Sequence, residues 1–224
     1  MSTKKSLKEV LDKIYNEYNL KTTCPGNCFC CSVACPQMAY SEFLSLIDFI
    51  YNKLDKNFRN AIIKNSIRYF FSNSLVKPCS LLVDKRCVCY EDRPLSCRLY
   101  GIIPKEMFEK RVEGFIKNTG LKKEEIPLNT QCQYVKRVDN SIPLTEKMIE
   151  DLYAKINNLD MGVGNFTKQQ IKKRYNQRTF HDWMMRFIFG EENLCGLTTF
   201  YLAAENKDVV DDFVKILCDK VSEM

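Results

Sequence analysis

Residues 24–35 read CPGNCFCCSVAC, and residues 79–97 read CSLLVDKRCVCYEDRPLSC. The first stretch has the spacing C-x3-C-x-C-C-x3-C and the second C-x7-C-x-C-x7-C, so together they hold nine of the chain's twelve cysteines. Pro25, Gly26 and Pro36 predict that the first stretch is a loop. Short loops bring cysteine sulfurs within a few ångströms of one another at little entropic cost, so both stretches are candidate metal-binding loops.

Helical periodicity surrounds the two cysteine stretches. Apolar residues recur at helical spacing over residues 5–20, from Ser41 to about residue 54, and over residues 57–74. A shorter helical pattern covers residues 105–118, and from about Leu144 onward the pattern is almost entirely helical. Strand alternation is weak throughout. We therefore expect a mainly α protein, a helical domain with cysteine-rich metal-binding loops inserted between the helices.

The expected organisation has two parts. Residues 1–140 form a helical hairpin with the cysteine-rich loops, and residues 141–224 form a C-terminal helical part that packs on it, unless the two make one single domain. The two helices between the cysteine stretches can form a hairpin that returns the chain, so we expect both stretches to fold against each other.

Three local signals refine the C-terminal part. Thr167 with Gln170 has the pattern of a capping box. Gly190 could end the apolar helix that begins near Phe180, and Asn206 could cap a last helix. The Met, Phe and Trp residues of 180–188 are expected to be core residues.

Composition predicts the compartment and limits the partners. No apolar run approaches 18 residues, and the lysine-rich start is followed by no apolar signal segment, so we expect a cytoplasmic protein with no membrane partner. The lysines and arginines behind the net charge of +6 are scattered among acidic residues along the chain. A nucleic-acid binder usually concentrates its positive charge on one face, so a nucleic-acid partner is not expected. The expected partner is a protein or redox partner whose identity the sequence does not give.

The cysteine count favours more than one metal centre. In a cytoplasm that keeps thiols reduced, such enrichment indicates metal ligands or redox thiols rather than disulfides. One zinc ion uses four cysteines, whereas two 4Fe–4S clusters use eight. The lone histidine, His181, is far from the cysteines in sequence, so an all-sulfur shell is expected. The candidate metal ligands are Cys24, Cys28, Cys30, Cys31, Cys35, Cys79, Cys87, Cys89, Cys97 and Cys132.

The two remaining cysteines, Cys195 and Cys218, lie in apolar helical patterns and are expected to pack in the core. Arg93 and Arg98 are candidates for binding the cofactor, because a cluster held by four thiolates is negatively charged and arginine can donate hydrogen bonds to its sulfurs. The alternative is that the two arginines pair with neighbouring carboxylates or helix carbonyls. Pro94 would fix a turn that directs Cys97 toward the other cysteines.

The elements Cys87-x-x-Tyr90 and Arg93-Pro94-x-x-Cys97-Arg98 resemble the signature of the YkgJ-type cysteine-cluster proteins, a family described as zinc- or iron-chelating. The resemblance covers about residues 24–104. It extends to Cys79 before a short apolar run, and to Cys30 and Cys31 before a helix with Glu42. The spacing around Cys28 differs from the family's CxxCxxCC, and Cys35 and Cys89 are additional, which suggests a larger metal load.

The family is similar to the cysteine-rich region of flagellin lysine N-methylases, so the resemblance also implies a protein-lysine methyltransferase that uses the cluster. Three functions therefore remain open: an iron–sulfur protein for redox or cluster-dependent chemistry, a structural or chelating zinc protein, and such a methyltransferase. The sharpest expectation is at least one 4Fe–4S cluster. Its ligands include Cys31, Cys79, Cys87 and Cys97, and the candidates for a second centre are Cys24, Cys28, Cys35, Cys89 and Cys132. No catalytic residue can be named.

Overall fold

The computed structural model describes residues 5–24, 29–128, 130–132, 134–139, 141–204 and 207–223. The protein is mainly helical, as its sequence predicts, and the cysteine-rich stretches lie in short elements and turns between longer helices. Within these residues, no helix is long and apolar enough to cross a membrane.

The elements follow one another along the chain with these bounds: α1 (Leu7–Asn16), α2 (Phe29–Val33), β1 (Gln37–Ala39), α3 (Tyr40–Lys53), α4 (Lys56–Phe70), β2 (Leu82–Val83), β3 (Arg86–Cys87), the 3₁₀ turn η1 (Tyr90–Asp92), α5 (Leu95–Leu99), α6 (Lys105–Thr119), the 3₁₀ turn η2 (Lys123–Glu125), α7 (Glu146–Val163), α8 (Lys168–Lys172), β4 (Gln177–Thr179), α9 (Phe180–Ala203) and α10 (Lys207–Glu223).

Helix starts follow side-chain capping. Ser6 caps α1 in a capping box with Glu9, and the predicted capping box of Thr167 with Gln170 is confirmed at the start of α8. The predicted end of the apolar helix at Gly190 is confirmed: Gly190 has a positive, non-helical φ of 74°, and a second helical part of α9 follows it to Ala203. The predicted cap at Asn206 lies outside the described residues.

Two short antiparallel sheets tie distant parts of the chain together. Strand β1 pairs with β4 in the register Gln37↔Thr179 and Ala39↔Gln177. Strand β2 pairs with β3 directly before η1. The first sheet therefore joins the end of the first cysteine stretch to the start of α9.

Two apolar cores meet at β1. Met38 belongs to the core that α3, α4, α9 and α10 enclose, while its neighbour Ala39 belongs to the core between α1, α5 and α7. Phe43 and Phe180 are among the largest fully buried side chains of the first core, and Leu95 and Leu99 of α5 are buried in the second.

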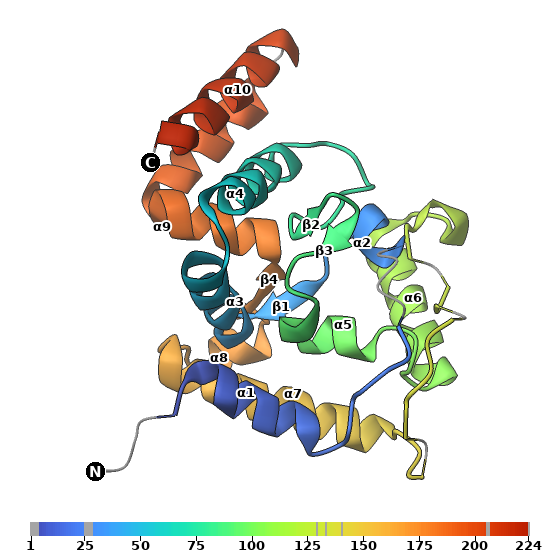
Figure 1. Cartoon of the computed structure of the whole chain (residues 1–224). Helices are drawn as coiled ribbons and strands as arrows, with labels where there is room; N and C mark the ends of the chain where they lie inside the picture. Colours follow the sequence, from blue (N-terminus) through green and yellow to red (C-terminus); the bar gives the residue numbers. More distant parts are fainter. Residues whose placement is uncertain are drawn as a thin grey trace.

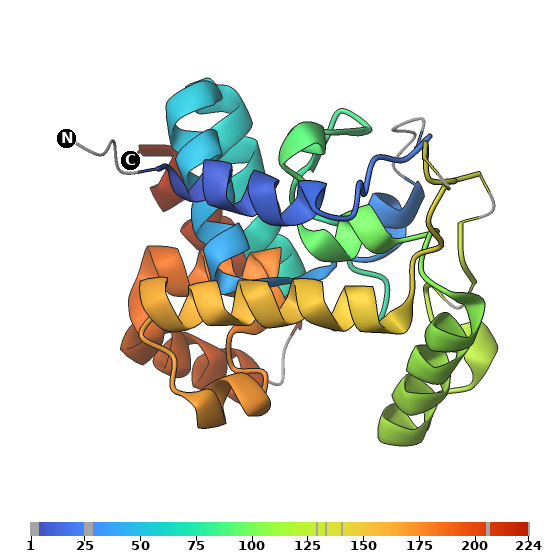
Figure 2. The ribbon, with the colours of Figure 1, turned by 90° about the horizontal axis from the view of Figure 1, so that it is seen from below.

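The helices form a frame around the cysteine stretches. Figure 1 shows α4, α9 and α10 at one end of the molecule and α6 at the other, with β1, β2 and α5 between them. Figure 2 shows α1 and α7 lying side by side, in agreement with their contacts. Helices α7 and α9, from the C-terminal part, contact α3 and α4, from the N-terminal part.

Candidate functional site: a pocket of cysteines

The two cysteine stretches lie against each other. The backbone N–H of Cys79 donates to the carbonyl of Cys31 over 2.7 Å, and the Sγ atoms of Cys35 and Cys79 are 4.0 Å apart. The predicted meeting of the two stretches is confirmed at these residues. Cys28, one of the candidate ligands, lies outside the described residues.

Cysteines from the two cysteine stretches and from the segment around Cys132 surround one cavity of about 60 Å³. Eight of them line it: Cys24, Cys30, Cys31, Cys79, Cys87, Cys89, Cys97 and Cys132. The rest of the wall is largely apolar and aromatic and includes Phe29, Met38 and Tyr100, and Arg93 contributes a cationic side chain. Cys79 and Cys89 also belong to the first apolar core, so the wall of the cavity is continuous with that core.

Cys132 reaches this cavity because the chain around it packs against the residues that follow α5. Gly101 follows α5 with a φ of +89°, and a Cβ at that position would lie 3.2 Å from Cys132 Cβ and 3.0 Å from Val135 Cβ. Only glycine accommodates both the positive φ and this close approach. The segment 134–138 pairs in turn with the residues before Cys24, through the bridge Thr22↔Arg137.

Neighbouring thiols of the cavity wall lie within hydrogen-bonding distance of one another. The Sγ atoms of Cys30 and Cys31 are 3.9 Å apart, and those of Cys87 and Cys89 are 3.8 Å apart. Hydrogen bonds from Cys31 and then Cys89 lower the pKa of Cys87, and the positive charge of Arg93 lowers it further. Burial raises the pKa of Cys97 well above its usual value. Hydrogen bonds and a nearby positive charge thus favour the thiolate of Cys87, whereas burial disfavours that of Cys97.

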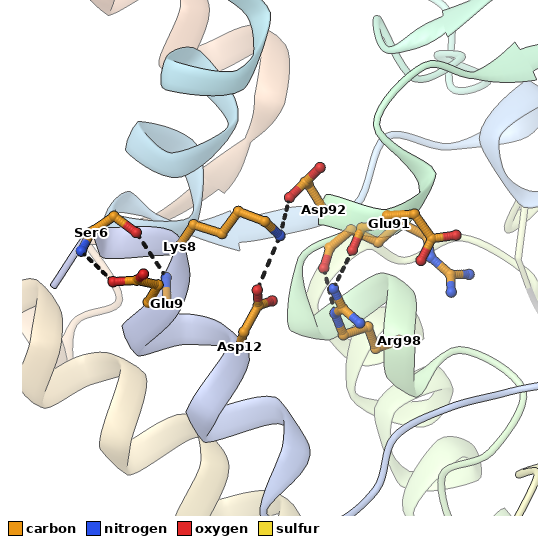
Figure 3. Close-up of polar contacts among 8 residues, drawn as sticks. Ser6, Lys8, Glu9, Asp12, Glu91, Asp92 and Arg98 are labelled. Atoms are coloured by element: carbon orange, nitrogen blue, oxygen red, sulfur yellow. Dashed lines mark hydrogen bonds and ion pairs between the residues drawn. The ribbon is translucent and has the colours of Figure 1, made fainter. Parts of the chain in front are cut away.

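The two arginines expected to bind the cofactor, Arg93 and Arg98, differ in their position relative to the cavity. Arg93 lines the cavity, its Cζ lies 3.7 Å from the Tyr90 ring centroid, and its buried Nε has no hydrogen-bond partner among the described residues. Arg98 instead donates from Nε to the Arg93 carbonyl over 2.7 Å and from its terminal nitrogen to the Glu91 carbonyl over 2.6 Å (Figure 3). Arg98 thus braces the turn that presents Arg93, in keeping with the carbonyl-pairing alternative.

The same turn is held to α1. Lys8 forms ion pairs with Asp92 of η1 and with Asp12, the latter at 3.1 Å (Figure 3). The Asp92 side chain is only 9% exposed, whereas that of Lys8 is 49% exposed, so the contact lies at the edge of the protein.

A buried carboxylate positions α5, the helix that carries Cys97. Glu42 accepts hydrogen bonds from the Tyr15 hydroxyl (2.6 Å), from the backbone N–H of Leu95 (2.6 Å) and from that of Ala39 (2.8 Å). Burial raises the pKa of Glu42 although these donors oppose the shift. One side chain of α3 therefore fixes α1, β1 and the first residue of α5 relative to one another.

The expectation that His181 is remote from the cysteines is wrong. His181 is the second residue of α9, and its imidazole interacts with the thiol of Cys35. The hydrogen bond with Cys79 is the largest influence lowering the pKa of Cys35, and His181 adds to it. The spacing of cysteines could not reveal this contact, because it depends on the pairing of β1 with β4.

Of the ten candidate ligands, eight line the cavity, and Cys35 lies directly behind it against Cys79. Cys195 is exposed on α9, contrary to the expected core packing, whereas Cys218 is buried in the first core as expected. Among the residues that the structure describes, no three histidine, cysteine, aspartate or glutamate side chains are arranged to hold a single metal ion as they stand.

No family model, curated protein or solved structure matches this chain. The resemblance to the cysteine-cluster family therefore stays a prediction.

Proposed function

We propose that this protein holds at least one 4Fe–4S cluster in the cysteine pocket and uses it for redox or cluster-dependent chemistry. The observation that carries the proposal is the convergence of eight cysteines, from three segments, on one cavity. Soft thiolates are the ligands that iron–sulfur clusters prefer, and eight exceed the four that one zinc ion uses. When bound, such a cluster supplies one-electron transfer or a Lewis-acidic iron.

The size of the cavity supports a group of several atoms. The ligands of a single zinc ion all lie within about 2.3 Å of one point and fill the space around it. The lining cysteines here surround about 60 Å³, room for more than one water-sized group. The thiolates of a cubane cluster each bind a different iron, so they stand further apart, around such a space.

The charge of the wall also supports the proposal. A cluster with four thiolates is an anion, and a low-dielectric pocket penalises an unpaired charge. Arg93 lines the cavity and carries a buried, unsatisfied Nε that could donate to a sulfur. Its neighbour Arg98 holds the backbone of Arg93 in place.

Zinc is the second candidate, and a specific observation favours it. The sulfur pairs at 3.8 Å and 3.9 Å match the roughly 3.8 Å edge of a tetrahedron of thiolates about 2.3 Å from zinc. The same distances are also ordinary contacts between thiols. The methyltransferase hypothesis follows from the family resemblance alone, and binding of S-adenosylmethionine to the purified protein would test it.

Metal and sulfide analysis after anaerobic purification tests the proposal. We expect a brown protein with about four iron and four sulfide per cluster. Cys97→Ser should lose iron and the visible absorption, because Cys97 lies in the cavity wall, whereas the control Cys195→Ser, on the exposed side of α9, should keep both. Zinc without iron in the wild type, or equal iron in both variants, would contradict the iron–sulfur proposal.

A further inference from the structure

A groove on the helical frame is separate from the cysteine pocket. It lies between the end of α3, one face of α4 and the first part of α9, and both α3 and α4 contact α9 (Figure 1). Its volume is about 280 Å³, and none of its wall residues also lines the cysteine pocket. The wall consists of Tyr51, Lys56, Arg59, Asn60, Ile63, Phe187 and Ile188.

The groove has an apolar and aromatic surface. The wall residues of α4 follow the spacing i, i+3, i+4 and i+7 from Lys56, so they occupy one face of that helix. Ile63 is only 7% exposed, whereas Tyr51 and Phe187 are 41% and 49% exposed, with ring centroids 6.0 Å apart. A cavity of about 150 Å³ can hold a benzene ring, so the groove has room for one large apolar side chain.

Both charged residues of the groove are cations without a carboxylate partner. Neither Lys56 nor Arg59 forms an ion pair within the part of the chain that the structure describes. The buried Nε of Arg59 likewise has no hydrogen-bond partner there. Residues 51–68 contain five lysines and arginines but one acid, Asp55, so they carry +4 of the chain's net +6. The Asp55 carboxylate caps α4 by accepting from two backbone N–H groups.

We propose that this groove docks an acidic segment of a partner protein. The segment inserts one large apolar side chain against Tyr51 and Phe187, and its carboxylates pair with Lys56 and Arg59. Unpaired cations attract and orient an acidic partner, and a guanidinium binds carboxylates in a defined geometry. An aromatic or aliphatic anchor in a pocket carries much of the binding energy of an interface. The proposal concerns the frame and does not depend on the metal in the cysteine pocket.

Fluorescence anisotropy with two labelled peptides and the full-length protein tests the proposal. The first peptide has aspartates and glutamates around one phenylalanine, and the second has serine in place of that phenylalanine. We expect the first to bind about tenfold more tightly than the second at physiological salt, because only its phenylalanine is buried in the groove. Phe187→Ser should remove most of this difference. Equal affinities of the two peptides for the wild type, or no binding of the first, would overturn the proposal.

Charge reversal tests which residues receive the carboxylates. Lys56→Glu and Arg59→Glu should each weaken binding of the phenylalanine peptide about tenfold. Lys56 is exposed in the first turn of α4, where the helix dipole favours a carboxylate, so Lys56→Glu decides the matter if Arg59→Glu does not fold.

Lys105→Glu is the matched control, because Lys105 is the first residue of α6, at the other end of the molecule (Figure 1). It changes the net charge equally and should leave binding unchanged. Equal weakening in Lys105→Glu and Lys56→Glu would show unspecific charge attraction and overturn the docking site. Labelled single-stranded DNA provides the second comparison. Tighter binding of DNA than of the phenylalanine peptide, lost in Lys56→Glu, would assign the groove to nucleic acid and overturn the protein partner.

Discussion

The cysteine pocket and the helical frame around it are built by different means. The pocket is assembled from α2 and α5, of five residues each, from the two-residue strands β2 and β3, and from turns. The frame is built from helices of 14 to 24 residues, α3, α4, α7 and α9. Short helices and two-residue strands are unstable alone, because their few backbone hydrogen bonds do not suffice. The pocket therefore needs further stabilising interactions.

The frame is stabilised by contacts between buried apolar side chains. Phe43, Ile67 and Phe180 are each no more than 1% exposed, and Phe43 packs against the rings of Phe180 and Trp183. In the pocket, eight thiols face the cavity beside apolar and aromatic side chains. The difference indicates that apolar burial stabilises the frame, whereas metal–thiolate bonds stabilise much of the pocket when metal is bound.

Removal of the metal should give the largest effect and should fall on the pocket. In hydrogen exchange followed by mass spectrometry, we expect amides of residues 79–99 to exchange about tenfold faster or more after chelation. Without metal, local opening of the pocket costs less free energy, because no metal–thiolate bonds have to break. Amides of α3 and α4 should exchange at nearly unchanged rates. Equal loss of protection in pocket and frame, or none in either, would contradict this division.

The reciprocal control perturbs the frame alone. Phe43→Ala should cost about 3–5 kcal/mol of unfolding free energy, measured by urea denaturation, because it leaves a cavity among packed rings. The metal content of each folded molecule should not change.

Glu42 joins the two regions, so its substitution should give an intermediate effect. In Glu42→Gln the amide nitrogen would face backbone donors, and we expect a loss of about 1–3 kcal/mol in the free energy of unfolding. Looser placement of α5 should also accelerate release of metal to a chelator. Destabilisation with unchanged metal release would show that Glu42 supports the frame only.

The same variant has a pH signature. The pKa of Glu42 is raised in the folded state, so the folded protein holds this proton more tightly than the unfolded chain does. Its contribution to stability is therefore full below the ordinary value of 4.5 and declines as the pH rises through the folded pKa. Glu42→Gln should flatten this part of the stability profile.

The smallest effect is expected at the edge of the pocket. Lys8→Ala removes the ion pair with Asp92, and surface pairs contribute about 0–1 kcal/mol. We expect a small loss of stability at low salt that disappears at high salt, because exposed charges are screened. A salt-independent loss would indicate that packing of the lysine stem matters more than its charge.

Local signals in the sequence predicted local structure well. The apolar periodicity predicted α3 and α4, although α4 ends at Phe70 and not near residue 74. The capping pattern at Thr167 placed the start of α8. Gly190 correctly marked the break in α9, because a glycine adopts a positive φ without steric cost.

By itself, the sequence determined the mainly helical frame and the supply of thiols in two dense stretches, because periodicity and composition act over a few neighbouring residues. Tertiary structure decided which thiols share a cavity. Cys132 lines it because the chain passes over Gly101, and Cys35 stands behind it. The pairing of β1 with β4 brings the start of α9, with His181, next to the end of the first cysteine stretch. Such contacts link residues far apart in the chain, and no local pattern encodes which strands pair or in which register.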